Sequence, residues 1–142
     1  MDRYRGTIAL LVFVLLPLFT APVHGQGLDP ASAAALSATL RALTDPAARD
    51  HAIAASPGAA EIDRQVRSLA ASPQLVQEIY ETAAAVFADL AASTGGDVGR
   101  MADALERART DPASLGALLT PETMRRLRDL SSRVPDVKRS SP

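Results

Sequence analysis

The chain has 142 residues, of which 15 are basic and 16 acidic, and it contains no cysteine. This length suits one domain rather than two, and the nearly balanced charge excludes the basic footprint of a nucleic-acid-binding domain. Without cysteine there is no disulfide framework, no thiol nucleophile and no thiolate ligand for a metal.

The first 25 residues have the layout of a secretory signal peptide. Arg3 and Arg5 precede the apolar run IALLVFVLLPLF, and a short stretch with small residues follows it. The run is shorter than the roughly 20 apolar residues that span a bilayer. We therefore expect cleavage after Gly25 and export to the periplasm or the extracellular space. The alternative is that the leader is kept as a membrane anchor.

Residues 26–134 are expected to form a single helical domain, and residues 135–142 a disordered tail. After the leader the chain has only two aromatic residues, Tyr80 and Phe87, among many alanines. A core with so few large side chains predicts modest stability, completed by a partner or a second copy. Arginine supplies 14 of the 15 basic residues, and this bias together with the alanine excess indicates a GC-rich bacterial genome.

Proline follows a good helix-capping residue at six places after the leader. Proline disfavours helical geometry in the residue before it, and its own fixed φ suits the first helical position. Asp, Ser or Thr before it can accept a hydrogen bond from the first-turn amides. We therefore expect six helix starts, at Asp29-Pro30, Asp45-Pro46, Ser56-Pro57, Ser72-Pro73, Asp111-Pro112 and Thr120-Pro121.

Between these starts the apolar residues recur at helical spacing, and no stretch alternates with the period of a strand. The stripe from Leu75 to Leu90 is the longest and broadest, which indicates a helix in contact with neighbours on several sides. The sequence predicts an all-α fold, a small bundle or array of about six or seven short helices around a central helix near residues 73–92. Shorter stripes stand on either side of it: Leu36, Leu40 and Leu43; Ile62, Val66 and Leu69; Val98, Met101, Leu105 and Ala108; Leu115, Leu118 and Leu119; Met124, Leu127, Leu130 and Val134.

Two nearly identical heptads occur in the chain, RALTDPA at residues 41–47 and RARTDPA at residues 107–113. Each is expected to contain the end of one helix and the start of the next. The residues Asp-Pro-Ala suit such a junction, and this alone explains why the two heptads are similar. A true internal repeat is the alternative, since a second cap and an apolar helix follow each heptad.

His51 is the only histidine after the leader. A zinc site needs three or four His, Cys or carboxylate ligands, so one histidine without cysteine supplies almost none of them. An axial haem ligand is an alternative role, but a surface or half-buried histidine beside Asp50 is the simpler interpretation. We expect no cofactor.

Carboxylates stand at helical spacing in three places: Glu61 and Asp63, Glu78 and Glu81, Asp103 and Glu106. Paired carboxylates can hydrolyse glycosidic bonds, so a cell-wall hydrolase is one hypothesis. However, Glu78, Glu81 and Asp89 fall on the side of their helix away from its apolar stripe, as on ordinary solvated faces. We therefore expect the protein not to be an enzyme.

The C-terminal end is basic, although the rest of the chain is acidic. Arg125, Arg126, Arg128 and Arg133 lie on the last predicted helix, whose Met124, Leu127 and Leu130 are expected to face inward. These arginines are the candidate interaction surface, for an acidic partner or an anionic membrane. The alternative is that they only complement the dipole at the helix C-terminus.

The stretch LLTPETMRRLRDL resembles the opening of the repeated Leu-Thr-x-x-Gln helices of periplasmic chaperones of the Spy and CpxP class, and ALTDPAARD is a second Leu-Thr stretch. Thr123 and Ala47 stand where that motif has glutamine, and the likeness covers less than a fifth of the chain. It identifies no family, but it implies an exported helical protein that binds other proteins through a shallow apolar surface.

We therefore expect a small, exported, non-catalytic helical protein that acts by protein-protein interaction, as a chaperone-like protein or a structural adaptor. Its partner is an unidentified protein or a second copy of the chain, with an anionic membrane surface as a further partner for the basic end. A carrier of an apolar ligand such as lipid or haem is the alternative function, and a cell-wall hydrolase is the third.

Overall fold

The computed structural model describes residues 30–134, which form helices without any strand. The all-α prediction is confirmed. The predicted leader, its cleavage after Gly25 and the predicted tail at 135–142 lie outside the described residues. The helices are α2 (Pro30–Thr44), α3 (Pro46–Ala55), α4 (Pro57–Leu69), α5 (Pro73–Thr94), α6 (Val98–Thr110), α7 (Pro112–Gly116) and α8 (Pro121–Arg133).

The predicted helix starts are confirmed, because all six prolines stand at the first position of a helix. The residue before proline caps the helix in the five cases whose cap is described, by accepting a hydrogen bond from a first-turn amide. These caps are Asp45, Ser56, Ser72, Asp111 and Thr120. One further start, that of α6, has no proline, and there Asp97 accepts from the amide of Arg100 at 3.0 Å.

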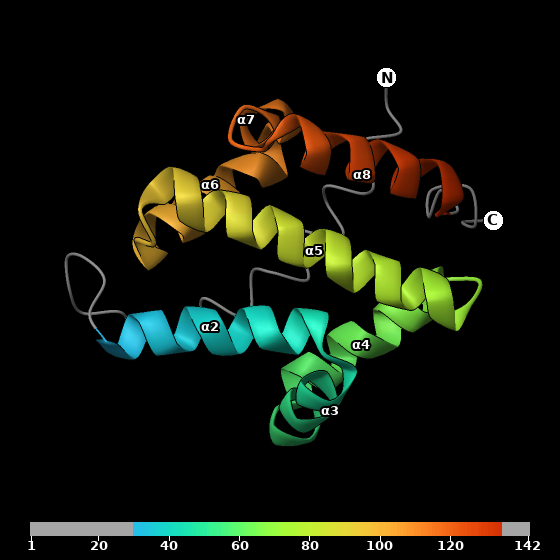
Figure 1. The fold of residues 1–142 in the computed structure, drawn as a ribbon. Coiled ribbons are helices and arrows are strands. Elements are labelled where there is room, and N and C mark those ends of the chain that lie inside the picture. The colour runs from blue at the N-terminus through green and yellow to red at the C-terminus, as the bar shows by residue number, and fades with distance from the viewer. Residues whose placement is uncertain (1–29, 135–142) are drawn as a thin grey trace.

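The predicted central helix is α5, and it packs against α2, α4, α6 and α8. In Figure 1 it runs between α2 on one side and α7 and α8 on the other. Ten of its residues are buried, which agrees with the broad apolar stripe in its sequence. It ends at Gly95 and Gly96, whose φ angles of 66° and 77° belong to the left-handed region that glycine adopts without strain.

Most residues of the stripes predicted on the other helices are buried in the core or pack against it, but Leu40, Leu69 and Val98 do not. Leu43 is buried and Leu36 packs against the core, but the side chain of Leu40 is 36% exposed. Among the described helices the main neighbours of α2 are α3 and α5, and these leave part of its surface uncovered. On α8, Leu127 and Leu130 are buried and Met124 is partly buried, as the spacing predicts.

No helix of the described part is both long and apolar enough to cross a membrane.

Candidate functional site

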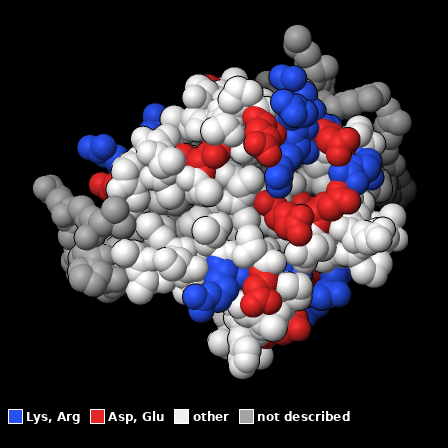
Figure 2. Space-filling view, in the orientation of Figure 1, with Lys and Arg blue, Asp and Glu red and all other residues white. Residues whose placement is uncertain are grey.

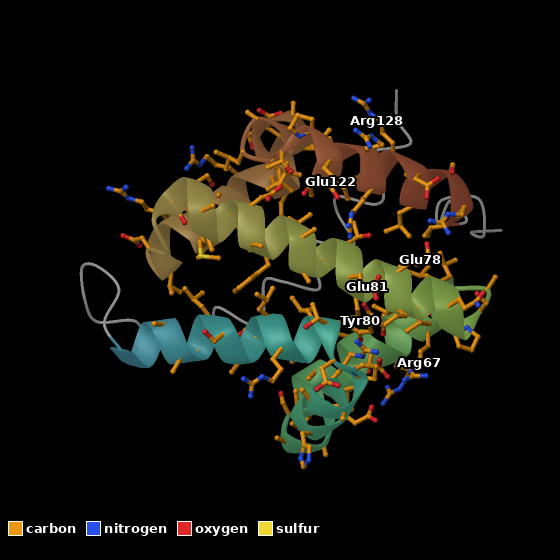
Figure 3. The ribbon with its side chains drawn as sticks, in the orientation of Figure 1. Arg67, Glu78, Tyr80, Glu81, Glu122 and Arg128 are labelled. Atoms are coloured by element: carbon orange, nitrogen blue, oxygen red, sulfur yellow. The ribbon has the colours of Figure 1, made fainter. Side chains whose placement is uncertain are left out.

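The four predicted interaction residues all lie on α8 and are all exposed. Arg126 forms an ion pair with Glu122, four residues before it, at 3.2 Å. Figure 3 shows Arg128 projecting from α8 on the side away from α5. Arg125 has no side-chain partner among the described residues. We call these three exposed residues the arginine face of α8; the acidic side chains of Glu122 and Asp129 are also exposed on this helix.

Arg133 does not belong to that face, because it joins α8 to α5. Its guanidinium forms ion pairs with Glu78 of α5 and, at 2.6 Å, with Asp129 of its own helix. The hydrogen bond to Glu78, together with the charges of both carboxylates, raises the pKa of Arg133. The structure thus separates the predicted interaction set into three outward arginines and one that contacts the central helix.

The carboxylates of α5 lie opposite its apolar stripe, where a solvated face was expected, and each of them also has a polar partner. Glu78 pairs with Arg133, and Glu81 accepts a hydrogen bond from Gln77 at 3.0 Å. Asp89 accepts hydrogen bonds from both the amide and the hydroxyl of Thr120, at 2.9 and 3.1 Å, where α8 begins. Glu78 and Asp89 thus have partners on or next to α8, which crosses this side of α5.

The described residues contain no group of three or more histidine, cysteine or carboxylate side chains that could hold a metal ion. His51 is exposed on α3, beside the exposed Asp50.

A polar cluster that the sequence did not predict lies where α3, α4 and α5 meet. Its centre is Tyr80, whose hydroxyl donates a hydrogen bond to Asp63 of α4 at 2.8 Å. The guanidinium of Arg49 from α3 lies 4.1 Å from the centroid of the Tyr80 ring and donates to Gln77 at 2.8 Å. Arg67 donates to the other oxygen of Asp63 at 2.6 Å. Figure 3 shows Tyr80 and Arg67 close together at this junction.

Burial and charge shift the ionisation of this cluster. Burial raises the pKa of Tyr80, because the phenolate would lose its hydration, and the hydrogen bond to Asp63 raises it further. The hydrogen bond to Asp63, followed by its negative charge, raises the pKa of Arg67. Arg49 and Asp63 are each only 8% exposed. Arg49 is thus a buried cation and Asp63 a buried anion, and both have partners. This arrangement indicates a structural junction between three helices.

A signal for this cluster was present in the sequence of α4. Asp63 directly follows Ile62 and precedes Val66 by three positions, so it belongs to the same side of the helix as the apolar stripe. Arg49 offered no comparable signal, because α3 is rich in alanine and has no large apolar stripe that defines its inner face.

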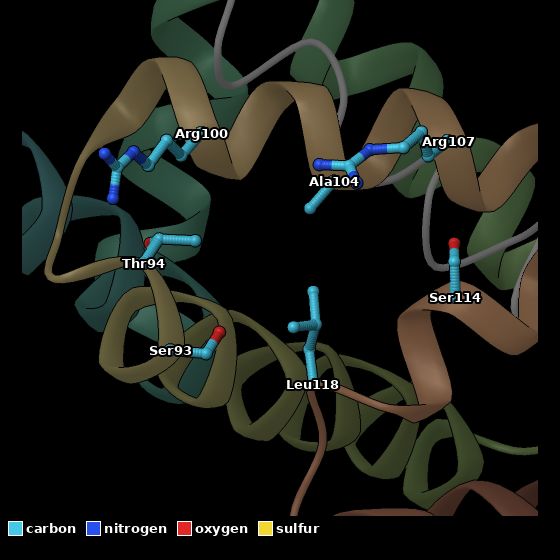
Figure 4. Close-up of a pocket in the computed structure, with 7 residues that line it drawn as sticks. All are labelled: Ser93, Thr94, Arg100, Ala104, Arg107, Ser114 and Leu118. Carbon is cyan, nitrogen blue, oxygen red and sulfur yellow. The ribbon is translucent and has the colours of Figure 1, made fainter.

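A pocket of about 320 Å³ lies on another part of the molecule, where α5 ends and α6 and α7 follow. Figure 4 shows Ala104 of α6 and Leu118 pointing toward one another across its opening. The remaining lining residues are polar: Ser93, Thr94, Arg100, Arg107 and Ser114. Sites for apolar ligands are lined mainly by apolar and aromatic side chains, so this pocket adds no support to carriage of lipid or haem, which stays a prediction.

The charged residues are unevenly distributed over the surface. Figure 2 shows charges of both signs gathered where α8 lies over the first half of α5, whereas the surface over α2 and the second half of α5 is largely uncharged.

Comparisons with protein families, with curated proteins and with solved structures give no match for this chain.

Proposed function

We propose that this chain is an exported, non-catalytic helical protein that binds an acidic partner protein through the arginine face of α8. The observation that carries the proposal is the exposure of Arg125, Arg126 and Arg128 within about one helical turn. Arg125 has no side-chain partner among the described residues, so its five donors are free to meet a carboxylate.

The attachment of α8 supports this role. Leu127 and Leu130 are buried against the core, Arg133 pairs with Glu78, and Thr120 bonds to Asp89. The helix therefore presents its arginines from a fixed backbone. A fixed surface loses little conformational entropy when a partner docks, which favours binding.

The net charge of the chain also indicates that an acidic partner would be attracted by a local basic surface and not by the molecule as a whole. Without its first 25 residues the chain has 13 basic and 15 acidic residues, because Arg3, Arg5 and Asp2 are lost. The attraction must therefore be local, within a Debye length of about 8 Å at physiological salt. We expect the association to weaken steeply as the salt concentration rises.

A charge-reversal experiment tests the proposal. A photoreactive amino acid at position 132, exposed on α8, captures neighbours in the envelope of the expressing cell. Capture is compared between the parent protein and the Arg125→Glu/Arg128→Glu variant. The matched control is Arg64→Glu/Arg109→Glu, which reverses two exposed arginines on α4 and α6. A defined acidic protein captured by the parent and by the control, but not by the α8 variant, is the expected result.

Two other outcomes would overturn the proposal. If all three proteins capture the same neighbours, the arginine face is not the binding surface. If instead the parent protein cosediments with vesicles containing phosphatidylglycerol and the α8 variant does not, the partner is an anionic membrane. Light scattering of the purified protein separates both outcomes from self-association.

A further inference from the structure

The pocket at the end of α5 has the chemistry of a site for a small anion. Its seven lining residues include two arginines and no acidic residue. Arg100, Ala104 and Arg107 stand at i, i+4 and i+7 on α6, so one side of that helix forms a wall of the pocket. The other walls come from the end of α5, from α7 and from Leu118, which follows α7.

Of the two arginines that line the pocket, Arg107 is the one whose guanidinium can bind a ligand. Its side chain has no hydrogen-bond or ion-pair partner among the described residues, although Arg109 of the same helix pairs with Glu106 at 3.2 Å. Figure 4 shows the guanidinium of Arg107 extending along the opening toward Ala104, while Arg100 points away from the centre of the pocket. Arg100 also lies 3.9 Å from Asp97, which partly neutralises it.

The hydroxyl groups of the pocket offer acceptors rather than donors. Ser93 and Thr94 both donate to the carbonyl of Leu90, at 3.1 and 2.6 Å, and Ser114 donates to the carbonyl of Asp111 at 2.7 Å. A hydroxyl has one hydrogen and two lone pairs. Each oxygen therefore remains able to accept a hydrogen bond from an N–H or O–H group of a ligand.

We propose that this pocket binds a small organic carboxylate that also carries an amide N–H, such as the C-terminal residue of a peptide. The carboxylate meets the guanidinium of Arg107, which can donate two parallel hydrogen bonds to it. The apolar side of the ligand lies between Ala104 and Leu118, and its N–H donates to the hydroxyl oxygen of Ser114. The volume of about 320 Å³ limits the ligand to this size class.

This site is independent of the arginine face of α8, because none of its lining residues belongs to α8. It also uses the second copy of the repeated heptad. Arg107 is the first residue of RARTDPA, and Arg41 holds the same place in RALTDPA but does not line the pocket.

Titration of the isotopically labelled protein with N-acetylalanine, followed by nuclear magnetic resonance, tests the proposal. We expect the signals of Ala104, Leu118 and Ser114 to shift together. The affinity should fall about tenfold or more in Arg107→Gln, which removes a charge-assisted pair. The control Arg109→Gln removes an exposed arginine of the same helix that does not line the pocket, and it should bind like the parent.

Two further ligands decide what the pocket recognises. N-acetylalanine amide keeps the shape and the N–H but lacks the charge, and it should bind about tenfold or more weakly. Inorganic phosphate has the charge but no apolar side, and it should not reproduce the shifts of Leu118. Equal binding of the amide, equal shifts with phosphate, or unchanged affinity in Arg107→Gln would each overturn the proposal. Arg107 is exposed, so thermal melting of both variants should match the parent.

Discussion

The helices on the two sides of α5 begin in the same way but bury different side chains. α3 and α7 both start with Asp-Pro-Ala, and α4 and α8 both start with a hydroxyl residue before proline and have 13 residues. The fourth position is Arg49 in α3 and Leu115 in α7, and both side chains are buried. The seventh position is Asp63 in α4 and Leu127 in α8, and again both are buried.

The difference shows that the same inward position can hold a charged side chain in one half of the molecule and a leucine in the other. In the first half Tyr80 and Gln77 of α5 provide partners for Arg49, and Tyr80 and Arg67 do so for Asp63. In the second half the equivalent leucines belong to the apolar core. A buried charge is tolerated only where a neighbour satisfies it, so the polar junction depends on Tyr80.

The largest expected effect comes from placing an aspartate at the seventh position of α8, where α4 has Asp63. Leu127→Asp would place an unpartnered carboxylate at a fully buried position, at a cost of several kcal/mol. We expect the variant to lose its folded structure in circular dichroism. The control Leu127→Met keeps the volume and should cost less than about 1.5 kcal/mol in urea unfolding. A stably folded Leu127→Asp variant would contradict the apolar character of this half.

Removal of the acceptor at the polar junction should have the next largest effect. Asp63→Ala leaves the Tyr80 hydroxyl and the Arg67 guanidinium without this partner, and we expect a loss of about 2–3 kcal/mol in the free energy of unfolding. With Tyr80→Phe in a double-mutant cycle, the coupling energy should be about 1 kcal/mol. Additive effects of the two substitutions would show that the hydrogen bond contributes nothing.

The pH dependence of stability tests the same junction. The folded state holds the proton of Tyr80 more tightly than the unfolded chain, where the pKa is about 10. This contribution is fully present below pH 10 and declines as the pH rises above 10 toward the raised folded-state value. Without the first 25 residues Tyr80 is the sole tyrosine, since the other is Tyr4. Tyrosinate absorbance therefore follows this group directly.

The matched variant for this pH experiment is Tyr80→Phe. Its free energy of unfolding should lack the component of the alkaline decline that belongs to Tyr80. A normal titration midpoint near pH 10 in the folded protein, or the same decline in both proteins, would contradict the burial of this side chain.

The smallest effects are expected at the aspartate caps, which the two halves share. Asp45 and Asp111 each accept a hydrogen bond from the second helical residue, at 3.0 and 3.2 Å. Asp45→Ala and Asp111→Ala should each lower the free energy of unfolding by about 1 kcal/mol. Asp50→Ala, at an exposed position inside α3, is the control and should change it by less than about 0.5 kcal/mol. A large difference between the two cap variants would show that the junctions are not equivalent.

Prediction from the sequence succeeded where the signal is local. Proline and its capping neighbour restrict the same few dihedral angles wherever they occur, so six helix starts and the central helix were predicted correctly. It failed where the partner is remote. Nothing near Arg133 in the sequence indicates Glu78, and nothing near Arg49 indicates Gln77. The pocket beside Arg107 was also missed, because residues from three helices and the segment after α7 line it.

The amino-acid sequence alone determined the helical class, the points where helices begin and the inward position of most leucines, because these depend on backbone geometry and on a period of 3.6 residues. The tertiary structure alone decided which charges are buried, which arginine of α8 contacts α5 and which arginine of α6 stays free beside a pocket. Those outcomes depend on which side chains meet across helices, and electrostatic and hydrogen-bond partners are chosen by proximity in space rather than along the chain.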